Sequence, residues 1–273
     1  MSAKGGRKGG KHAPQHAPGR EEGFAIWGVN PVAEALRRRP GWVKEVLLAG
    51  GNARLAAIYE LARRKGVPVR SVSRPELPGS GKQQGVAAWL RRPPFLAFAD
   101  LLDSLPADEP FVLLALDQVQ DPHNFGAILR CAAAVGVRAV LFPRHGSAPL
   151  SGAAWKASAG TAILVDCCQV PNLAVALQQL RDRGVWLYGA DLADSASLFA
   201  TDFAFPLCLV VGGEGRGLRP LVRRQCDALV RIPMSAGVES LNVAVSTGVL
   251  LYEIRRQSGI APLSPGKNPP PSR

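Results

Sequence analysis

The stretch RIPMSAGVESLNVAVSTGVLLYE, residues 231–253, begins like an apolar strand, breaks into a small polar loop and continues as an apolar helical run. The loop is made of small or hydrogen-bonding residues, namely Ser235, Ala236, Gly237, Ser240 and Asn242. Apolar residues follow it at helix-compatible spacing: Val243, Val245, Val249, Leu250 and Leu251. Such a loop offers backbone N–H and C=O groups to a ligand, which predicts one wall of an active site. An ordinary strand-to-helix connection with an N-cap near Ser240 explains the same pattern.

Upstream of this stretch, apolar strands alternate with helices. The predicted strands are FVLLALD (111–117), AVLFP (139–143), AILVD (162–166), VWLYGA (185–190) and LCLVVGG (207–213). Near-continuous apolar runs of this kind are typical of strands that are covered on both faces. Helices are predicted from about Asn124 to Gly136 and over 173–184. The alternation predicts an α/β domain with a parallel sheet over residues 111–257.

A smaller α/β domain is predicted over residues 23–92. Its expected strands cover 43–48, 67–73 and 85–90, and its expected helices begin near Asn30 and Pro31 and run over 52–65. Residues 93–110 contain four prolines and four acidic residues, which indicates a linker with one or two helical turns. The ends, 1–22 and 258–273, hold few large apolar residues and are predicted to be a disordered basic arm and a flexible tail.

The net charge of +12, with an isoelectric point near 10.1, is concentrated in the smaller domain. Residues 23–92 carry thirteen Lys and Arg against four acidic residues, whereas residues 111–257 carry thirteen against eleven. This asymmetry favours a module that binds a polyanion such as nucleic acid beside a catalytic domain. A solvated basic face that only aids solubility is the alternative.

Apolar residues make up 47% of the chain, enough for substantial cores, yet no run reaches the roughly 18 residues of a membrane span. The first residues lack the apolar core of a signal peptide, so a cytoplasmic protein without a membrane partner is expected. The cysteine count is five, an odd number, and no C-x-x-C pair occurs. We therefore expect reduced, mostly buried thiols rather than disulfides, and no metal site.

Three polar segments lie where predicted strands of the larger domain end: DQVQDPHNFGAILR (117–130), GGEGRGL (212–218) and the loop at 235–242. Ligands of parallel α/β sheets bind at such carboxyl ends. The glycines at 212–217 do not form G-x-G-x-x-G in a first βα turn, and GxxxxGK[ST] is missing from the sequence. A dinucleotide or phosphate-cradling site is therefore disfavoured, and a plain glycine-rich turn remains an alternative for this segment.

Taken together, the three segments resemble the signature motifs of the SpoU/TrmH family of RNA 2′-O-ribose methyltransferases, part of the SPOUT superfamily. The matching segments are DQVQDPHNFGAILRCA (117–132), LVVGGEGRGL (209–218) and IPMSAGVESLNVAVSTGVLLYE (232–253), in the family's order. In the smaller domain, GVNPVAEALRRRP and QQGVAA look like the family's RNA substrate-binding domain. The resemblance covers roughly residues 23–257.

The resemblance implies a trefoil-knotted SPOUT domain after a small L30e/L7Ae-like RNA-binding domain, and a homodimer. It implies S-adenosylmethionine as methyl donor, with a guanosine of 23S rRNA, free or in an assembling large ribosomal subunit, as substrate. The cofactor pocket would be lined by Gly212, Gly213, Ile232, Pro233, Met234 and Leu241.

The family's catalytic and substrate-orienting positions are occupied by Asn124, Arg130, Glu214, Ser240 and Asn242. Arg130 is the leading candidate, either as a base helped by a substrate phosphate or as a group that stabilises the forming alkoxide. A helix-surface arginine paired with Asp121 is the structural alternative. His123 lies in a Pro-containing turn at a position that the motif does not assign to catalysis, so we expect a turn or core histidine.

Phosphate contacts are predicted for two basic clusters of the smaller domain, Arg37, Arg38 and Arg39, and Arg63, Arg64 and Lys65. Three other functions remain open from sequence: a tRNA ribose methyltransferase, a ribosome-assembly factor that binds rRNA without catalysis, and, more remotely, a nicotinamide-dependent oxidoreductase.

Overall fold

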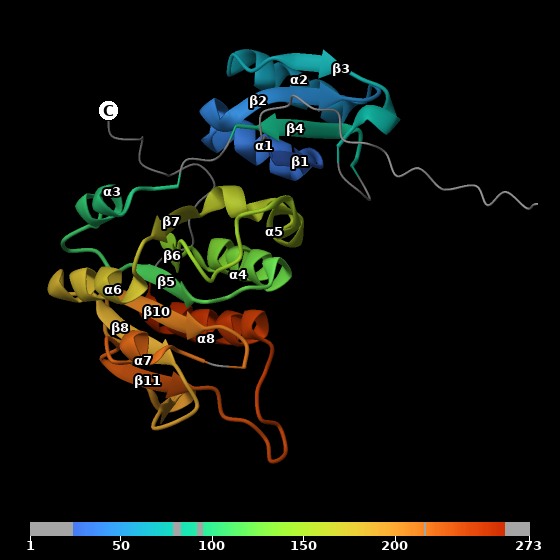
Figure 1. Ribbon diagram of the computed structural model, residues 1–273. Helices are drawn as coiled ribbons and strands as arrows, with labels where there is room; N and C mark the ends of the chain where they lie inside the picture. The colour runs from blue at the N-terminus through green and yellow to red at the C-terminus, as the bar shows by residue number, and fades with distance from the viewer. Residues whose placement is uncertain (1–23, 79–82, 92–94, 216, 260–273) are drawn as a thin grey trace, which may run out of the picture.

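The computed structural model describes residues 24–78, 83–91, 95–215 and 217–259 (Figure 1). The predicted basic arm, 1–22, and the predicted tail beyond Gly259 lie outside the described residues. Two sheets account for the strands of the described chain, one of four strands and one of seven.

The four-stranded sheet carries the first unit. Across the sheet the strands are β1 (Phe24–Trp27), β4 (Val86–Leu90), β2 (Val43–Leu48) and β3 (Val69–Ser71). Strand β4 is antiparallel to both of its neighbours, and β3 is parallel to β2. The helical segments are α1 (Val29–Arg38), η1 (Pro40–Trp42), α2 (Ala53–Arg64) and η2 (Arg74–Glu76). The expected strand over 67–73 is shorter than predicted, because only Val69–Ser71 pairs with β2.

The seven-stranded sheet is parallel throughout, as predicted. Its order is β7 (Asp166–Val170), β6 (Ala139–Pro143), β5 (Val112–Asp117), β10 (Leu207–Gly212), β8 (Trp186–Ala190), β11 (Ala228–Arg231) and β9 (Ala196–Ser197). Its helical segments are α3 (Phe98–Asp103), α4 (Pro122–Val135), α5 (Gly152–Ala157), η3 (Thr161–Leu164), α6 (Leu173–Asp182), η4 (Leu198–Ala200), α7 (Pro220–Arg223) and α8 (Val243–Ser258).

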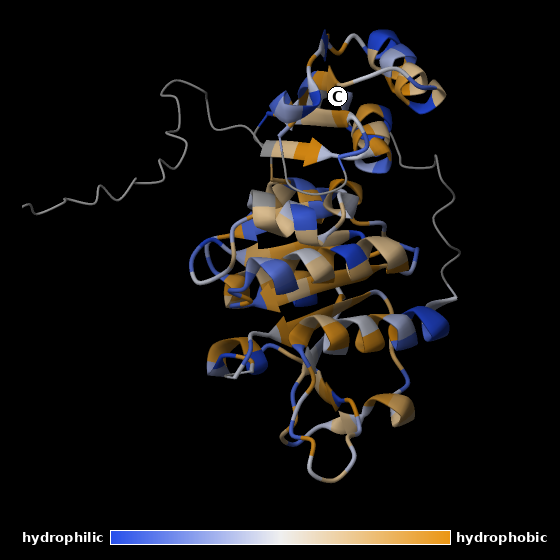
Figure 2. Ribbon diagram, turned by 90° about the vertical axis from the view of Figure 1, so that its right-hand side faces the viewer, coloured by the Kyte–Doolittle hydropathy of each residue, from blue (hydrophilic) through white to orange (hydrophobic). Residues whose placement is uncertain are grey.

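Helices cover both faces of this sheet, which explains its continuous apolar strands. Side chains of α4, α5 and α8 share one core with Val112, Leu114 and Leu116 of β5. The alternate residues of β5, Leu113 and Ala115, pack with α3, α6 and α7 in a second core. The strands accordingly appear hydrophobic between helices of mixed hydropathy (Figure 2). Among the described residues, no helix has the length and apolarity to cross a membrane.

The prediction of a strand at 162–166 is wrong. Gly160, at φ 79°, begins the 3₁₀ helix η3, which buries Ala162 and Ile163. Strand β7 starts only at Asp166, and its Cys167, Cys168 and Val170 are buried. A short apolar run does not distinguish a buried helical turn from a buried strand, and the error has this origin.

The cysteine side chains are mostly buried, as expected. Cys167, Cys168 and Cys208 lie in the cores, and Cys131 and Cys226 are partly exposed. Burial raises the pKa of Cys167 and Cys168 to about 12, so these thiols stay protonated at neutral pH.

The predicted linker contains a helix. Residues 98–103 form α3, which buries Leu101 and Leu102, and the N–H of Leu96 donates to the carbonyl of Cys167 on β7 at 2.9 Å. The segment is thus packed along the larger sheet. The boundaries that we assign to the two domains remain a prediction.

Helices α4 and α5 pack so closely that Gly126 has no room for a side chain. A Cβ at Gly126 would overlap the carbonyl oxygen of Ala154 and lie 2.6 Å from Cβ of Ala157. Gly126→Ala should therefore lower the free energy of unfolding by about 1–3 kcal/mol, the usual effect of overpacking, measured by urea denaturation.

Gly248→Ala in α8 is the matched control, because a Cβ there meets only Sγ of Cys131 at an ordinary 3.5 Å. This change should raise the free energy of unfolding by up to about 1 kcal/mol through helix propensity. Equal effects of the two substitutions would contradict the close packing of α4 on α5.

Candidate active site

The three motif segments meet at the carboxyl edge of the seven-stranded sheet. Strands β5 and β10 pair in register so that Asp117 lies opposite Gly212, the last residue of each strand. The N–H of Gly213 then donates to the Asp117 carbonyl at 2.8 Å, which continues the pairing into the glycine-rich segment. Strand β11 ends at Arg231 on the same side of the sheet, so only the first residue of the stretch 231–253 belongs to a strand.

The glycines of GGEGRGL allow this segment to fold back on itself. Gly213 and Gly217 form a β-bridge, and Gly217 N–H donates to the Gly213 carbonyl at 3.2 Å. A Cβ at Gly212 would overlap the backbone of Gly217, and one at Gly213 would overlap the carbonyl oxygen of Gln118. The close approach of the backbone therefore requires glycine at both positions, whether or not either residue contacts a ligand.

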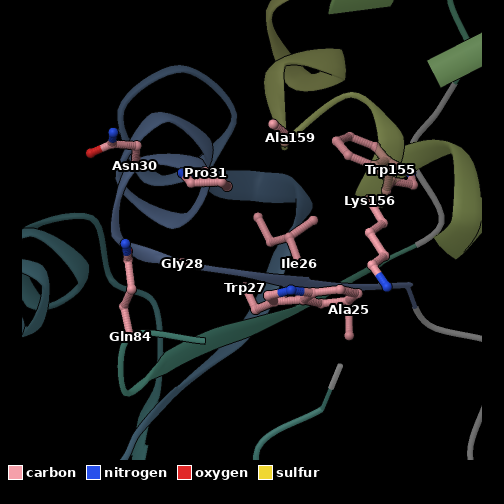
Figure 3. Close-up of a pocket in the computed structure, with 11 residues that line it drawn as sticks. Ala25, Ile26, Trp27, Gly28, Asn30, Pro31, Gln84, Trp155, Lys156 and Ala159 are labelled. Atoms are coloured by element: carbon pink, nitrogen blue, oxygen red, sulfur yellow. The ribbon is translucent and has the colours of Figure 1, made fainter. Parts of the chain in front are cut away.

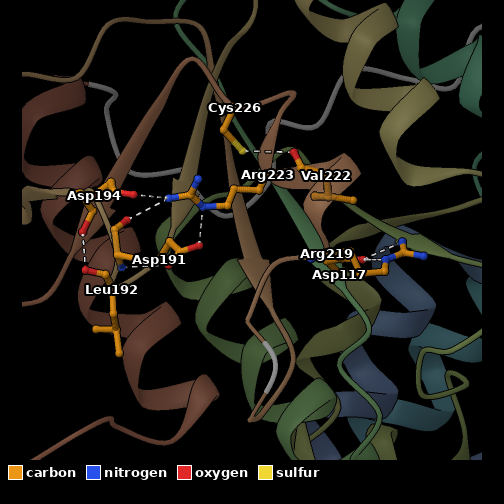
Figure 4. A network of polar contacts seen from close by, with 10 residues as sticks. Asp117, Asp191, Leu192, Asp194, Arg219, Val222, Arg223 and Cys226 are labelled. Atoms are coloured by element: carbon orange, nitrogen blue, oxygen red, sulfur yellow. Dashed lines mark hydrogen bonds and ion pairs between the residues drawn. The ribbon is translucent and has the colours of Figure 1, made fainter.

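An ion pair between a buried carboxylate and a partly exposed arginine, which the sequence analysis missed, holds the end of this segment. The carboxylate of Asp117 is fully buried and accepts from the backbone N–H of Arg219 at 2.9 Å and from its guanidinium at 2.7 Å (Figure 4). The partners are 102 residues apart in sequence, and no local spacing signals such a pair. A buried carboxylate requires this compensation, because an unpaired charge in a core is strongly unfavourable.

A second network lies beside this ion pair. Arg223 of α7 bonds Asp191 at 3.0 Å and the Ala193 carbonyl at 3.1 Å, and pairs with Asp194 at 3.6 Å (Figure 4). These contacts tie α7 to the segment that follows β8.

Three side chains, one from each motif, form a continuous hydrogen-bonded series. The amide of Asn242 donates to Oδ1 of Asn124 at 3.0 Å, and the amide of Asn124 donates to Oε1 of Glu214. Asn124 lies in the first turn of α4, Glu214 in the glycine-rich segment and Asn242 at the start of α8. The Glu214 side chain is exposed, so its carboxylate remains open to a ligand.

Asn242 also begins α8. Its Oδ1 accepts from the N–H groups of Ala244 at 2.9 Å and Val245 at 3.3 Å, which is an N-cap. The expectation of a cap near Ser240 is therefore wrong by two residues. Ser240 itself is exposed.

Arg130 is not part of the Asn242–Asn124–Glu214 series. Six residues of helix place it about 9 Å along α4 from Asn124 and about 120° around the axis. Its side chain is exposed, and among the residues that the structure describes no hydrogen bond or ion pair holds it. The alternative of a pair with Asp121 does not occur, because Asp121 caps α4 and accepts from the N–H of His123 at 2.9 Å. His123 is an exposed residue of the first turn.

The loop between β11 and α8 has few internal contacts. In this described loop, one backbone hydrogen bond forms, from Val238 N–H to the Ser235 carbonyl at 3.2 Å, around Gly237 at φ 86°. Ile232 packs partly on the core, Met234 is half-buried, and Pro233 and Leu241 are exposed. The loop thus offers apolar side chains and backbone amides together.

The two basic clusters differ in their partners. Arg37 and Arg38 pair with Glu34 at 2.7 and 3.1 Å, and Arg39 pairs with Asp166 on the second unit. On α2, Arg63 makes one exposed contact with Glu60 at 3.4 Å, while Arg64 and Lys65 have no ion pair among the described residues. The α2 cluster is therefore the better placed for phosphate contacts.

Comparison with known proteins gives a consistent result over both units. The SpoU rRNA methylase family matches residues 111–252, and the family described as RNA 2′-O ribose methyltransferase substrate binding matches residues 25–96. The 23S rRNA (guanosine-2′-O-)-methyltransferase RlmB of Xanthomonas campestris is 47% identical over 238 residues, which cover 85% of this chain and 96% of that protein. RlmB of Pseudomonas aeruginosa is 41% identical with the same coverage of this chain.

Solved structures show the same likeness. The SpoU methyltransferase AviRb from Streptomyces viridochromogenes, in complex with AdoMet, superimposes with a TM-score of 0.72 at 27% identity, covering 86% of this chain and 90% of that one. An AdoMet-bound rRNA methyltransferase from Sinorhizobium meliloti gives a TM-score of 0.73 at 26% identity, covering 86% and 87%.

The double role of Asn242 can be separated by two substitutions. Asn242→Ala removes the cap of α8 and should lower the free energy of unfolding by about 1 kcal/mol. Asn242→Asp keeps an oxygen acceptor for the N–H groups of Ala244 and Val245 and should retain wild-type stability, although it no longer donates to Asn124. Urea denaturation of both variants measures this, and equal loss in both would show that the bond to Asn124, not the cap, carries the stability.

Proposed function

The chain belongs to the SpoU rRNA methylase family, and on that basis we propose that it transfers a methyl group from S-adenosylmethionine to the ribose 2′-oxygen of a guanosine in 23S rRNA. The observation that carries the proposal is the series Asn242–Asn124–Glu214, which joins all three motif segments at one edge of the sheet. The likeness to the Xanthomonas enzyme over nearly its whole length supports the choice of substrate. Because this substrate is ribosomal RNA, the proposed location is the cytoplasm.

The segments around Gly212 and Ile232 fit the proposed cofactor. Its adenine ring requires apolar contact and hydrogen bonds to its edge, and the loop after β11 provides the side chains of Ile232, Met234 and Leu241 beside backbone groups with few internal partners. We assign Gly212, Gly213, Ile232, Pro233, Met234 and Leu241 to this pocket. When bound, S-adenosylmethionine supplies an electrophilic methyl group on a sulfonium.

The chain's own residues have to hold the ribose and stabilise its 2′-oxygen while that oxygen loses its proton. A 2′-hydroxyl is a weak nucleophile, and its proton must pass to water or to an RNA phosphate as the oxygen–carbon bond forms. A guanidinium group carries a positive charge and several N–H donors, so we assign Arg130 to an RNA phosphate or to the negative charge that develops on the 2′-oxygen. Among the described residues Arg130 has no hydrogen-bond or ion-pair partner, so its donors are available to RNA.

Asn124, Glu214 and Asn242 orient the reacting nucleotide in this proposal. The amide of Asn124 is shared between Asn242 and Glu214, so its position is fixed before a substrate arrives. The exposed Glu214 carboxylate accepts from the N–H groups of a guanine or from a ribose hydroxyl. Ser240, two residues before Asn242, is exposed and is assigned to the same ribose.

Two finer features of the fold belong to the same proposal. The segments 212–218 and 232–242 would form the crossing of a trefoil knot. Two observations support this: β10 lies between β5 and β8, and both segments begin at the carboxyl edge of the seven-stranded sheet. The first unit would be L30e/L7Ae-like and would bind RNA through Arg63, Arg64 and Lys65 on α2, with a smaller contribution from Arg37, Arg38 and Arg39.

A homodimer is proposed from the exposed apolar face of α8. Val245, Val249 and Tyr252 lie at helical spacing on this face and are 53%, 37% and 59% exposed. Contiguous apolar side chains on a helix are typical of a contact surface.

The direct test of function is transfer of labelled methyl from S-adenosylmethionine to total RNA from a strain that lacks this gene, followed by mapping of alkali-resistant sites. A new 2′-O-methylguanosine in 23S rRNA is expected. A tRNA site would retain the chemistry and change the substrate, and tight binding of RNA without transfer would favour an assembly factor.

Arg130→Ala should lower the rate of methyl transfer about 100- to 1,000-fold, the usual effect of removing one donor to a developing negative charge. The dissociation constant of S-adenosylmethionine, measured by calorimetry, should stay within about twofold. Arg224→Ala, which removes an exposed arginine after α7, is the control and should leave both quantities unchanged. A large loss of cofactor binding in Arg130→Ala would refute the assigned role.

Val249→Glu should convert the proposed dimer to monomers, because it places a charge in the apolar face of α8. Sedimentation velocity measures the change. Val175→Glu is the matched control, since Val175 is an exposed valine of α6 that lies outside this face. A wild-type chain that sediments as a monomer would contradict the proposal.

A further inference from the structure

The positive charge of the second unit is concentrated in one stretch of sequence. Residues 122–165 contain four Lys and Arg and no acidic residue, whereas the rest of residues 111–257 hold nine Lys and Arg against eleven acidic residues. This stretch forms α4, β6, α5 and η3. It borders the first unit, because η3 contacts α1 and α5 lines a common cavity with β1 (Figure 3). The second unit is therefore most basic beside the first unit.

The loop that follows β6 lies between the first unit and the motif segments. We call residues 144–150, RHGSAPL, the β6 loop. Strand β6 lies between β5, which leads into the first motif segment, and β7, the edge strand whose Asp166 pairs with Arg39 of the first unit. The three strands are parallel, so the β6 loop leaves the sheet at the same carboxyl edge as the motif segments.

Two hydrogen bonds hold the backbone of the β6 loop. The N–H of Arg144 donates to the carbonyl of Val170, the last residue of β7, at 2.9 Å. The N–H of Ala148 donates to the carbonyl of Val119 at 2.8 Å, and Val119 belongs to the first motif segment. The side chains of the loop therefore project from a backbone that is attached both to the sheet and to the candidate site.

The alternation of side chains along β6 gives the direction of Arg144. Val140 and Phe142 pack in the core that contains α4, α5 and α8, whereas Leu141 packs in the core on the other face of the sheet. The bond from Arg144 to β7 continues the pairing of β6 by one residue, so alternation places the Arg144 side chain on the face of α4 and α5. Arg144 therefore lies on the same side of the sheet as Arg130, which is exposed on α4.

The side chains of Arg144 and His145 are available to a ligand. Both are exposed, and among the residues that the structure describes neither side chain has a hydrogen bond or an ion pair. The guanidinium group offers five N–H donors in a planar fork, and the imidazole ring offers at least one more. Arg219, by contrast, is bound to the carboxylate of Asp117. The β6 loop thus presents unpaired donors and positive charge to solvent.

The kind of ligand follows from the charge and the exposure of the loop. The planar donors of an arginine match the oxygens of a phosphate, and no acidic residue within 122–165 competes for them. An exposed loop holds a single small anion weakly, because water and salt screen the attraction. A polyanion that is already held at other points brings its phosphates to such a loop at a high effective concentration. RNA that contacts the first unit and the candidate site meets this condition.

We propose that Arg144 and His145 bind backbone phosphates of the RNA substrate, between the part that the first unit holds and the nucleotide that is methylated. The inference rests on the proposed function, because it takes the substrate to be RNA. It adds a contact outside the three motif segments. It also gives the RNA a course over the molecule, from the first unit along the carboxyl edge beside β6 to the motif segments.

The test uses the full chain and a labelled, unmodified 23S rRNA transcript, with binding measured by filter retention over a range of salt concentrations. Loss of one phosphate contact in Arg144→Ala should weaken binding about 3- to 10-fold at about 0.15 M salt, and should reduce the slope of log affinity against log salt by about 0.7–0.9. Arg144→Lys keeps the charge and should retain most of the slope. Arg144→Ala combined with His145→Ala should bind more weakly than Arg144→Ala alone.

Methyl transfer gives an independent measurement. KM for the transcript should rise in Arg144→Ala by the same factor as the dissociation constant of RNA. The value of kcat and the dissociation constant of S-adenosylmethionine should stay within about twofold, because a phosphate contact away from the reacting atoms contributes equally to the ground state and the transition state.

Arg224→Ala is the matched control, because it removes the same charge elsewhere. Arg224 is exposed and lies between α7 and β11, at the amino edge of the sheet, opposite the motif segments. Its RNA affinity and salt slope should equal those of the wild type. An equal loss in Arg224→Ala and Arg144→Ala would overturn the proposal, since net charge and not a local contact would then explain both.

Unchanged affinity and salt slope in folded Arg144→Ala would also overturn the proposal. Arg144→Gln, which lacks the charge but keeps a long polar side chain, decides the matter if Arg144→Ala does not fold. A wild type that transfers no methyl group would refute the proposed function, and filter retention would still decide the contact. A wild type that methylates the transcript without any dependence on Arg144 would refute this inference alone.

Discussion

The buried carboxylate of Asp117 is the constraint on which the edge of the sheet with the three motif segments depends. It lies at the end of the central strand β5, and its ion pair with Arg219 fastens the far end of the glycine-rich segment back onto that strand. The backbone bond from Gly213 to the Asp117 carbonyl fastens the near end. Glu214 lies between these two attachments and accepts the hydrogen bond from Asn124. The electrostatic requirement of one buried group thus determines where a loop 100 residues later lies.

Much of the fold could be predicted from the sequence. Strands such as 111–117 are apolar on both faces, and the parallel sheet follows from that pattern. The segment 162–166 could not be assigned correctly, since its apolar residues fit a buried 3₁₀ turn as well as a strand. The positive φ of Gly160 begins the 3₁₀ turn instead of a strand, and this angle cannot be read from the residue type alone.

The candidate site was predictable only through its three motifs. The resemblance named Asn124, Glu214 and Asn242, but the hydrogen bonds among them became apparent only in three dimensions. The pair Asp117–Arg219 could not be found, because its partners are distant in sequence and each looks like an ordinary charged residue. The basic clusters are a different case: the six cations are grouped by charge in the sequence, and only the structure shows that Arg37, Arg38 and Arg39 pair with acidic neighbours.

Asn242 couples the site to the first turn of α8. Its side chain holds the first turn of that helix and, through the same amide group, the series that leads to Glu214. First turns fray more readily than helix centres. Each time this turn opens, Asn242 loses its anchor and the third motif segment loses its hydrogen bond to Asn124, while the bond from Asn124 to Glu214 does not involve this turn. The assembly of the site is therefore coupled to the opening equilibrium of a single helical turn, and a ligand that orders this turn would also favour the bond from Asn242 to Asn124.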